Sequence, residues 1–226
     1  MKSILLNVLA LLAGIVIFIG LPLLGWGISE IFQFFANPAR LTYAILILLL
    51  QIFSIFYNPQ IGRNKKERKS GVKKHKADLV LIQIFSLSVV FIAPFSDKHS
   101  ICILNFGEVV RFSGFIFVIA GFILMQMAEK YLDKQFSVEV TVQKNHKLIQ
   151  SGPYKFIRHP RYLGILTFFM GISIVFRSLL SIFFVAALCI VLIWRVYAEE
   201  SLMHQEFDKE WEIYCKKSWR IIPFLF

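Results

Sequence analysis

The feature that most constrains this chain is a series of apolar runs, each about long enough to cross a lipid bilayer. A transmembrane helix needs about 20 consecutive apolar residues. Backbone N–H and C=O groups in lipid must be satisfied within the segment, so such runs are expected to be helices. We expect six spans, at Ile4–Gly25, Leu41–Tyr57, Leu79–Phe95, Val109–Ala128, Leu163–Phe176 and Leu179–Tyr197. The sequence therefore predicts an all-α polytopic membrane protein with about six transmembrane helices.

Composition excludes several other classes of protein. Of the 226 residues, 57% are hydrophobic and 17% charged, whereas soluble domains are about 45–50% apolar and about 25% charged. The three cysteines, Cys102, Cys189 and Cys215, lack the spacing of a metal site or a disulfide framework. No metal is therefore expected, and the sequence has no glycine-rich phosphate loop.

The basic residues indicate orientation rather than nucleic-acid binding. The formal net charge is +11, and Gly62–Lys76 carries eight Lys and Arg residues against one acid, Glu67. Loops rich in Lys and Arg stay on the cytoplasmic side of a membrane. Counting spans from this loop predicts that the N-terminus, the segment after the fourth span and the C-terminus are cytoplasmic.

Two polar stretches flank the last two spans. Only Arg177 and Ser178 separate these spans, so a helical hairpin is expected, and its feet bring together "SGPYKFIRHPRYLG" (151–164) and the polar stretch 199–224. We therefore divide the chain into N-terminal transmembrane helices, residues 1–128, and a catalytic region, residues 129–226. The second part would hold the hairpin, a small cytoplasmic cofactor-binding region and a cytoplasmic C-terminal helix.

The first polar stretch has the character of a site rather than a connecting loop. Pro153 and Pro160 restrict their own backbones and those of the residues before them. The side chains of Tyr154, Arg158 and His159 are therefore expected to project from irregular backbone.

The second half of the site stands at the other foot of the hairpin. Arg195 and Glu199 lie four residues apart, on one face of a helix. Ionisable residues at the edge of a span are costly and point to function. Elsewhere, Gly114 and Gly121 are expected to allow close packing between helices, and Leu202, Trp211 and Tyr214 suggest an interfacial amphipathic helix.

Together the two stretches resemble the isoprenylcysteine carboxyl methyltransferase family, part of a wider group of integral-membrane S-adenosylmethionine-dependent methyltransferases that includes phospholipid methyltransferases. The resemblance covers "HKLIQSGPYKFIRHPRYLG" and "RVYAEESLMHQEFDKEWEIY", from about Leu132 to Tyr214. The chain departs from the pattern at Asp133 and Asp208, where the family often has glycine, and at Trp211, where it often has tyrosine.

The resemblance implies a set of site residues. Arg195 would face the substrate, Glu199 would contact S-adenosylmethionine, and Glu200 completes the acidic pair, which makes these three the candidate catalytic residues. The remaining cofactor-binding candidates come from the first stretch: His146, Lys147, Leu148, Ile149, Tyr154, Arg158, His159, Pro160, Arg161 and Tyr162.

The chemistry of these residues suits methyl transfer. An acid and aromatic faces attract a cationic sulfonium group, and Arg195 could orient a carboxylate acceptor, which needs no base. An amine or thiol acceptor would need a proton removed, and Glu199, Glu200 and His159 are then candidates. The expected acceptor is a lipophilic or prenylated molecule from the bilayer, a phospholipid amine or a lipophilic thiol; membrane lipids are expected neighbours.

Two other classes remain open at this stage. A membrane reductase that uses NADPH could carry a similar Arg-His-Pro turn, although the pair Glu199/Glu200 is poorly suited to a phosphate-rich cofactor. A scaffold or transporter subunit is the third class, but transport sites tend to lie near the midplane of the membrane, whereas these polar residues cluster at one end. Neither the methyl acceptor nor the oligomeric state follows from the sequence.

Overall fold

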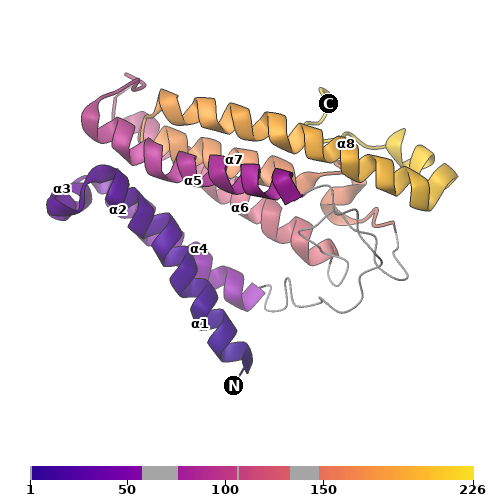
Figure 1. The fold of residues 1–226 in the computed structure, drawn as a ribbon, viewed down its shortest axis with the longest axis horizontal. Helices are drawn as coiled ribbons and strands as arrows, with labels where there is room; N and C mark the ends of the chain where they lie inside the picture. The colour runs from indigo at the N-terminus through magenta and orange to yellow at the C-terminus, as the bar shows by residue number, and fades with distance from the viewer. Residues whose placement is uncertain (1, 58–75, 106, 133–147) are drawn as a thin grey trace.

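The computed structural model describes residues 2–57, 76–105, 107–132 and 148–226, and helices dominate it (Figure 1). These residues form no strand, only two isolated β-bridges. The helices, in chain order, are α1 (Lys2–Ile15), a π-helical turn (Val16–Gly20), α2 (Leu21–Trp26), a 3₁₀ turn (Ile28–Glu30), α3 (Ile31–Ala36), α4 (Pro38–Tyr57), α5 (Lys76–His99), α6 (Val109–Leu132), a further 3₁₀ turn (Gly152–Lys155), α7 (Pro160–Val175) and α8 (Leu179–Cys215). The short β-like stretch that the sequence suggests at 136–142 lies outside the described residues.

Five helical segments are long and apolar enough to cross a membrane: Asn7–Trp26, Pro38–Tyr57, Ala77–His99, Val109–Leu132 and Leu179–Cys215. Helix α7 is also apolar but has only 16 residues. At 1.5 Å per residue it is roughly 24 Å long, less than the ~30 Å of a hydrocarbon core. Most of its residues are buried against other helices. The all-α membrane fold is confirmed, and a sixth crossing would depend on this short, protein-covered helix.

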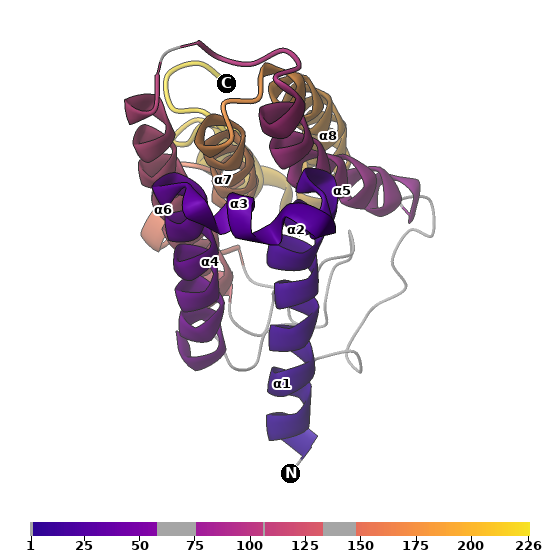
Figure 2. The same ribbon diagram turned by 90° about the vertical axis from the view of Figure 1, so that its left-hand side faces the viewer.

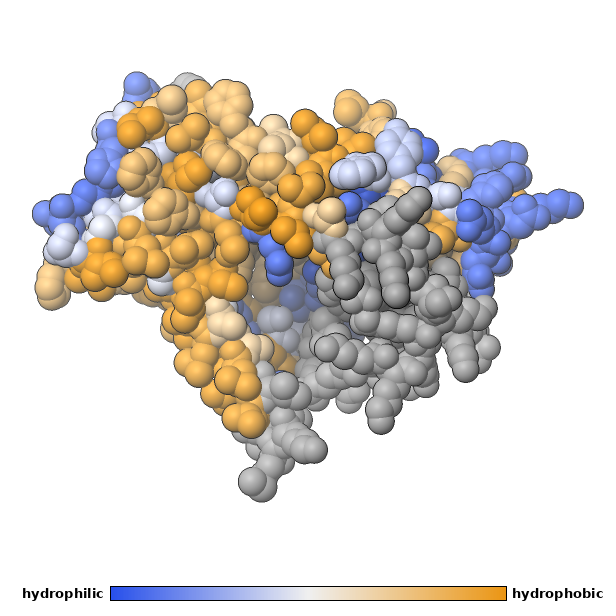
Figure 3. Space-filling view, in the orientation of Figure 1, coloured by the Kyte–Doolittle hydropathy of each residue, from blue (hydrophilic) through white to orange (hydrophobic). Residues whose placement is uncertain are grey.

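The helices form two groups. Helices α5, α6, α7 and α8 lie alongside one another in a four-helix bundle, while α1 and α4 lean away from them (Figures 1 and 2). We call residues 2–57, from α1 to α4, the arm. The arm joins the bundle near one end, where α2 packs on α5. Apolar side chains cover much of the described part of the face shown in Figure 3, as lipid contact requires. On α6, for example, Val109, Phe112, Ile116 and Ile123 follow helical spacing and are 47–82% exposed.

Glycines bring α6 and α7 into backbone contact, as Gly114 and Gly121 predict. A Cβ atom on Gly121 would lie 2.6 Å from the carbonyl oxygen of Gly164, and one on Gly114 would lie 2.7 Å from that of Gly171. Both are closer than real Cβ contacts allow. The partner glycines are also seven residues apart, so the two helices cross on matching glycine pairs.

A side-chain hydrogen bond links the first span to α4. Pro22, in the first turn of α2, has no N–H to donate to the preceding turn. The hydroxyl of Tyr43, from α4, donates to the carbonyl oxygen of Phe18 at 2.9 Å. Tyr43 is fully buried, so the bond links α4 to the first span at a point where lipid offers no alternative donor.

The hairpin turn between α7 and α8 is short because one residue adopts a left-handed conformation. Arg177 has a φ of 52°; its N–H donates to Ile174 O at 2.9 Å, and that of Ser178 donates to Ser173 O at 2.9 Å. These two bonds are those of a Schellman motif, which ends a helix. The hydroxyl of Ser178 then accepts from Ser181 N and caps α8. The predicted hairpin is confirmed.

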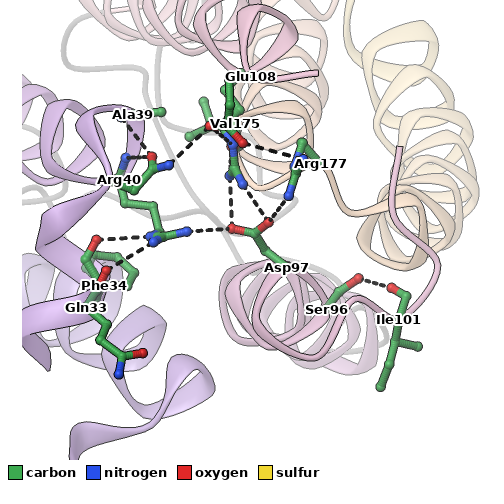
Figure 4. A network of polar contacts seen from close by, with 12 residues as sticks. Gln33, Phe34, Ala39, Arg40, Ser96, Asp97, Ile101, Glu108, Val175 and Arg177 are labelled. Atoms are coloured by element: carbon green, nitrogen blue, oxygen red, sulfur yellow. Dashed lines mark hydrogen bonds and ion pairs between the residues drawn. The ribbon is translucent and has the colours of Figure 1, made fainter. Parts of the chain in front are cut away.

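Close to this turn, one buried carboxylate joins four parts of the fold (Figure 4). Asp97 lies 2.7 Å from Arg111 on α6, and 3.2 Å from both Arg40 on α4 and Arg177 in the turn. Its side chain is 1% exposed. The span predicted from the sequence ends at Phe95, whereas α5 continues to His99. The arginines draw Asp97, on this added turn, into the interior.

Candidate functional site

The motif 151–164 has irregular backbone, as its prolines predict. Gly152 has a φ of 59° and opens a 3₁₀ turn. His159 has φ −123° and ψ 58°, outside the helical region, and Pro160 occupies the first turn of α7. Proline is favoured there because its missing N–H would have no partner within the helix. The start of α7 therefore fixes where the His159 side chain emerges.

The backbone of the motif is bound to a segment near the end of the sequence. The N–H of Arg158 donates to Trp219 O at 2.8 Å, and that of His159 donates to Arg220 O at 2.9 Å. In return, Trp219 N–H donates to Phe156 O at 2.9 Å. These bonds place residues 218–220 beside the motif. The sequence analysis missed this segment, because no pattern in it signals pairing with residues sixty positions earlier.

Tyr162 lies at the centre of a hydrogen-bonded network that spans the hairpin. Its hydroxyl donates to Glu199 Oε1 at 2.6 Å and accepts from Arg195 Nε at 2.7 Å. Arg195 Nε also lies 2.9 Å from Glu199 Oε1, the contact expected from their spacing. The ring of His159 stacks on Tyr162 with centroids 5.6 Å apart. The structure therefore brings together these four predicted residues from the two feet of the hairpin.

His159 lies between the two glutamates of the acidic pair. Nδ1 is 3.5 Å from Glu199 Oε2, and Nε2 is 3.5 Å from Glu200 Oε1. Burial alone would lower the pKa of His159, but the two carboxylates stabilise the imidazolium and raise the pKa above its ordinary value. The protonated form of His159 is therefore favoured in the folded protein.

Glu200 ties the motif to the last segment of the chain. Its two oxygens accept from Arg158 Nε and Arg220 Nε, each at 2.8 Å. The guanidinium of Arg158 also donates to the carbonyl oxygens of Ser218 and Cys215. These contacts are structural in kind. The catalytic role of Glu200 and the cofactor-binding role of Arg158 stay predictions.

The remaining predicted residues lie around this network. Tyr154 is buried and its hydroxyl donates to Ala128 O at 3.3 Å, while Arg161 Nε contacts Glu129 at 2.9 Å. Leu148 and Ile149 are half-buried. His146 and Lys147 lie outside the described residues.

The network carries an excess of positive charge. Three guanidinium groups, those of Arg158, Arg195 and Arg220, lie against the two carboxylates of Glu199 and Glu200. Counted over the described residues of the network, these groups sum to one positive charge, and to two when His159 is protonated. Arg195 is 2% exposed, so its charge is poorly screened by water. The arrangement favours an anionic group beside it.

A groove of about 760 Å³ opens on another side of Glu200. Its volume lies within the range of roughly 300–1,000 Å³ that is typical of small-molecule pockets. Beyond Glu200, it is lined by residues of both parts of α8 and of the segment that follows: Tyr197, Ser201, His204, Gln205, Trp211, Glu212, Cys215, Lys216 and Arg220. Sequence reasoning found none of these as site residues.

The stretch that carries the network is similar in sequence to known proteins. Residues 114–205 match the sequence profile of the isoprenylcysteine carboxyl methyltransferase family. This stretch contains the motif, the hairpin and both glutamates. Over this stretch the chain is similar to that family. A probable protein-S-isoprenylcysteine O-methyltransferase of rice (Oryza sativa subsp. indica) is 30% identical over 123 residues, 51% of this chain and 62% of the relative. The chain thus spans less than two thirds of that relative's length.

The fold agrees with that of a solved family structure. The eukaryotic intramembrane Ras methyltransferase ICMT superposes with a TM-score of 0.57 at 20% identity, over 90% of this chain and 72% of that one. A Delta(14)-sterol reductase of Ascobolus immersus is also similar, at 32% identity, but over 37% of this chain and only 20% of its own length. The family match ends at residue 205, so Ser218–Arg220, which bind the motif here, lie beyond it.

Proposed function

We propose that this protein is an integral-membrane S-adenosylmethionine-dependent methyltransferase that acts on a carboxylate of a lipophilic, prenylcysteine-like acceptor. The observation that carries the proposal is the buried network of Arg195, Tyr162 and Glu199. It joins the two stretches of family sequence at one end of the hairpin. The rice relative's name states the same class of reaction for that protein.

The residues present fit S-adenosylmethionine, which supplies an electrophilic methyl group when bound. Its sulfonium is cationic, and Glu199, whose side chain is 23% exposed, offers a carboxylate beside the aromatic ring of Tyr162. Tyr154 and His159–Tyr162 would hold the rest of the cofactor, together with the segment 146–149. Glu199 would be kept ionised and in place by its bonds to Arg195 and Tyr162.

The excess positive charge favours a carboxylate acceptor over an amine or a thiol. Arg195 can bind a carboxylate through two parallel N–H donors, and a carboxylate is already deprotonated near neutral pH. An amine or thiol would require a base, but His159 is biased toward its protonated form and Arg195 occupies one oxygen of Glu199. Positioning the reactants in line would then supply most of the rate enhancement.

The proposed topology explains why the site sits at the end of the bundle. With the loop at 62–76 in the cytoplasm, both termini and the network would face the cytoplasm. The cofactor would then enter from water, and an apolar acceptor would arrive from the bilayer.

The test is binding and turnover in purified, detergent-solubilised protein. Glu199→Gln keeps the shape of the side chain but removes its charge, and should weaken S-adenosylmethionine binding by at least about tenfold in calorimetry. Arg195→Lys should retain cofactor binding but lower methylation of a soluble prenylcysteine, because lysine cannot reproduce the two-donor contact.

The matched control is His204→Ala, which changes an exposed groove residue and should leave S-adenosylmethionine binding intact. If His204→Ala abolishes binding and Glu199→Gln does not, the cofactor occupies the groove instead. Tight binding of NADPH without S-adenosylmethionine binding would replace the proposal with a reductase.

A further inference from the structure

The last six residues of the sequence form a turn that exposes large apolar side chains. Phe226 N–H donates to Ile222 O, and Ile221 N–H donates to Phe226 O, each at 3.0 Å. Ile221 is buried, but Phe224 is 87% exposed and Leu225 is 80% exposed. Phe224 also has a φ of 66°, a left-handed conformation that costs a non-glycine residue free energy. The turn therefore presents apolar surface at a conformational cost.

The turn lies beside α8 at the level where a bilayer that begins at Leu179 would end. Phe226 contacts the ring of Tyr197, with centroids 6.4 Å apart, and the guanidinium of Arg220 packs against both rings. Tyr197 is eighteen residues after Leu179, the start of α8, or roughly 27 Å along the helix. That length is close to the thickness of a hydrocarbon core, ~30 Å. Accordingly, the chain ends beside α8 rather than beyond its last residue (Figure 1).

Helix α8 exposes aromatic side chains beside the terminal turn. Trp194 and Tyr197 are 57% and 50% exposed, as in the aromatic belts that mark membrane–water interfaces. One turn earlier in the same helix, Ile190 is 69% exposed, as expected for a lipid-facing residue. A bilayer that covers Ile190 would reach Phe224 and Leu225 at its boundary.

Charge near the turn matches an anionic leaflet. Lys216 and Lys217 are exposed and immediately precede the segment. Of the exposed acids of this region, Glu206, Asp208 and Glu210 lie earlier in α8, and Glu212 lines the same groove as Lys216. Each Lys or Arg near an anionic membrane surface contributes about 1 kcal/mol of attraction.

We propose that residues 221–226 are an interfacial lipid anchor. Phe224 and Leu225 insert at the boundary between headgroups and acyl chains, and Lys216 and Lys217 meet anionic headgroups. The anchor holds the segment 218–220 that pairs with the motif, so contact with the bilayer stabilises the backbone at Arg158 and His159. The proposal does not depend on the reaction that the site carries out.

The first experiment measures depth with nitroxide labels in nanodiscs of phosphatidylcholine and phosphatidylglycerol. In the full chain with the native cysteines replaced by serine, Leu225→Cys, Ile190→Cys and Lys209→Cys are labelled in turn. The label at 225 should collide with oxygen more than with a water-soluble nickel complex, as at 190. The label at 209 should show the reverse. If position 225 behaves like 209, or is shielded only when two copies share a disc, the anchor is refuted.

The second experiment measures the coupling to the motif by amide hydrogen exchange. Phe224→Ser/Leu225→Ser should lose protection at the amides of Arg158 and His159 in nanodiscs, compared with the unsubstituted chain. Lys216→Gln/Lys217→Gln should do so to a smaller extent, and more in discs with phosphatidylglycerol than in phosphatidylcholine alone. Unchanged exchange in both variants would overturn the coupling, whatever the protein's activity.

Discussion

Asp208 is held in a conformation that suits glycine. Helix α8 is interrupted at this residue, where φ is 41° and ψ is −112°, and such a backbone costs a non-glycine residue about 1–3 kcal/mol. The family pattern often has glycine here. We expect Asp208→Gly to raise the free energy of unfolding by about 1 kcal/mol, measured by chemical denaturation in detergent. Lys209→Gly, at a helical position next to it, should lower it by about 0.5–1 kcal/mol. A loss in both variants would show that Asp208 is not strained.

His159 makes the stability of the site depend on pH. Because its pKa is raised in the folded state, the folded protein binds this proton more tightly than the unfolded chain does. The stabilisation is fully present below the unfolded pKa of about 6.5 and is lost as the pH rises through the higher folded pKa. Thermal unfolding of the unsubstituted protein should show a Tm that falls as the pH rises through this range. In His159→Gln that part of the pH dependence should be absent; a parallel fall in both proteins would assign it to another group.

At the scale of elements, the packing of α7 on α6 depends on glycine. A Cβ atom on Gly121 would lie 2.4 Å from Phe168 N and 2.6 Å from Gly164 O, and backbone atoms cannot give way as a flexible side chain can. Gly121→Ala should therefore cost about 1–3 kcal/mol of stability, or more if the helices separate. Gly20→Ala is the matched control in another span, because its nearest contact would be 3.9 Å. Equal Tm values for the two variants would contradict the close contact.

At the scale of the whole molecule, Asp97 holds the arm to the bundle at the end opposite the candidate site. Asp97→Asn leaves Arg40, Arg111 and Arg177 without their shared charge, and breaking a buried ion pair costs about 3–5 kcal/mol. The change should also expose α4 to proteolysis, since Arg40 is its link to Asp97. Glu108→Gln is the control: Glu108 contacts the same Arg111 and Arg177 but is 55% exposed. Glu108→Gln should cost less than about 1 kcal/mol of stability. Comparable stability losses in the two variants would contradict the proposal that Asp97 holds the arm to the bundle.

Local signals in the sequence were enough to predict the helices, the hairpin and the close packing of α6 on another helix. Span length depends on bilayer thickness, and the two-residue turn at Arg177 forces α7 and α8 together, so Arg195, Glu199 and the motif could be assigned to one site. The spacing of Gly114 and Gly121 predicted a close contact between helices.

The tertiary structure alone decided the partners of these residues. Contacts between distant residues bury Asp97 and pair Trp219 and Arg220 with the motif. They also turn Trp211 and Tyr214 inward: the sequence predicts these two residues on a membrane-facing helix, but they are 6% and 4% exposed. Such contacts leave no periodic trace in one chain, because a side chain's partner is set by the packing of whole helices.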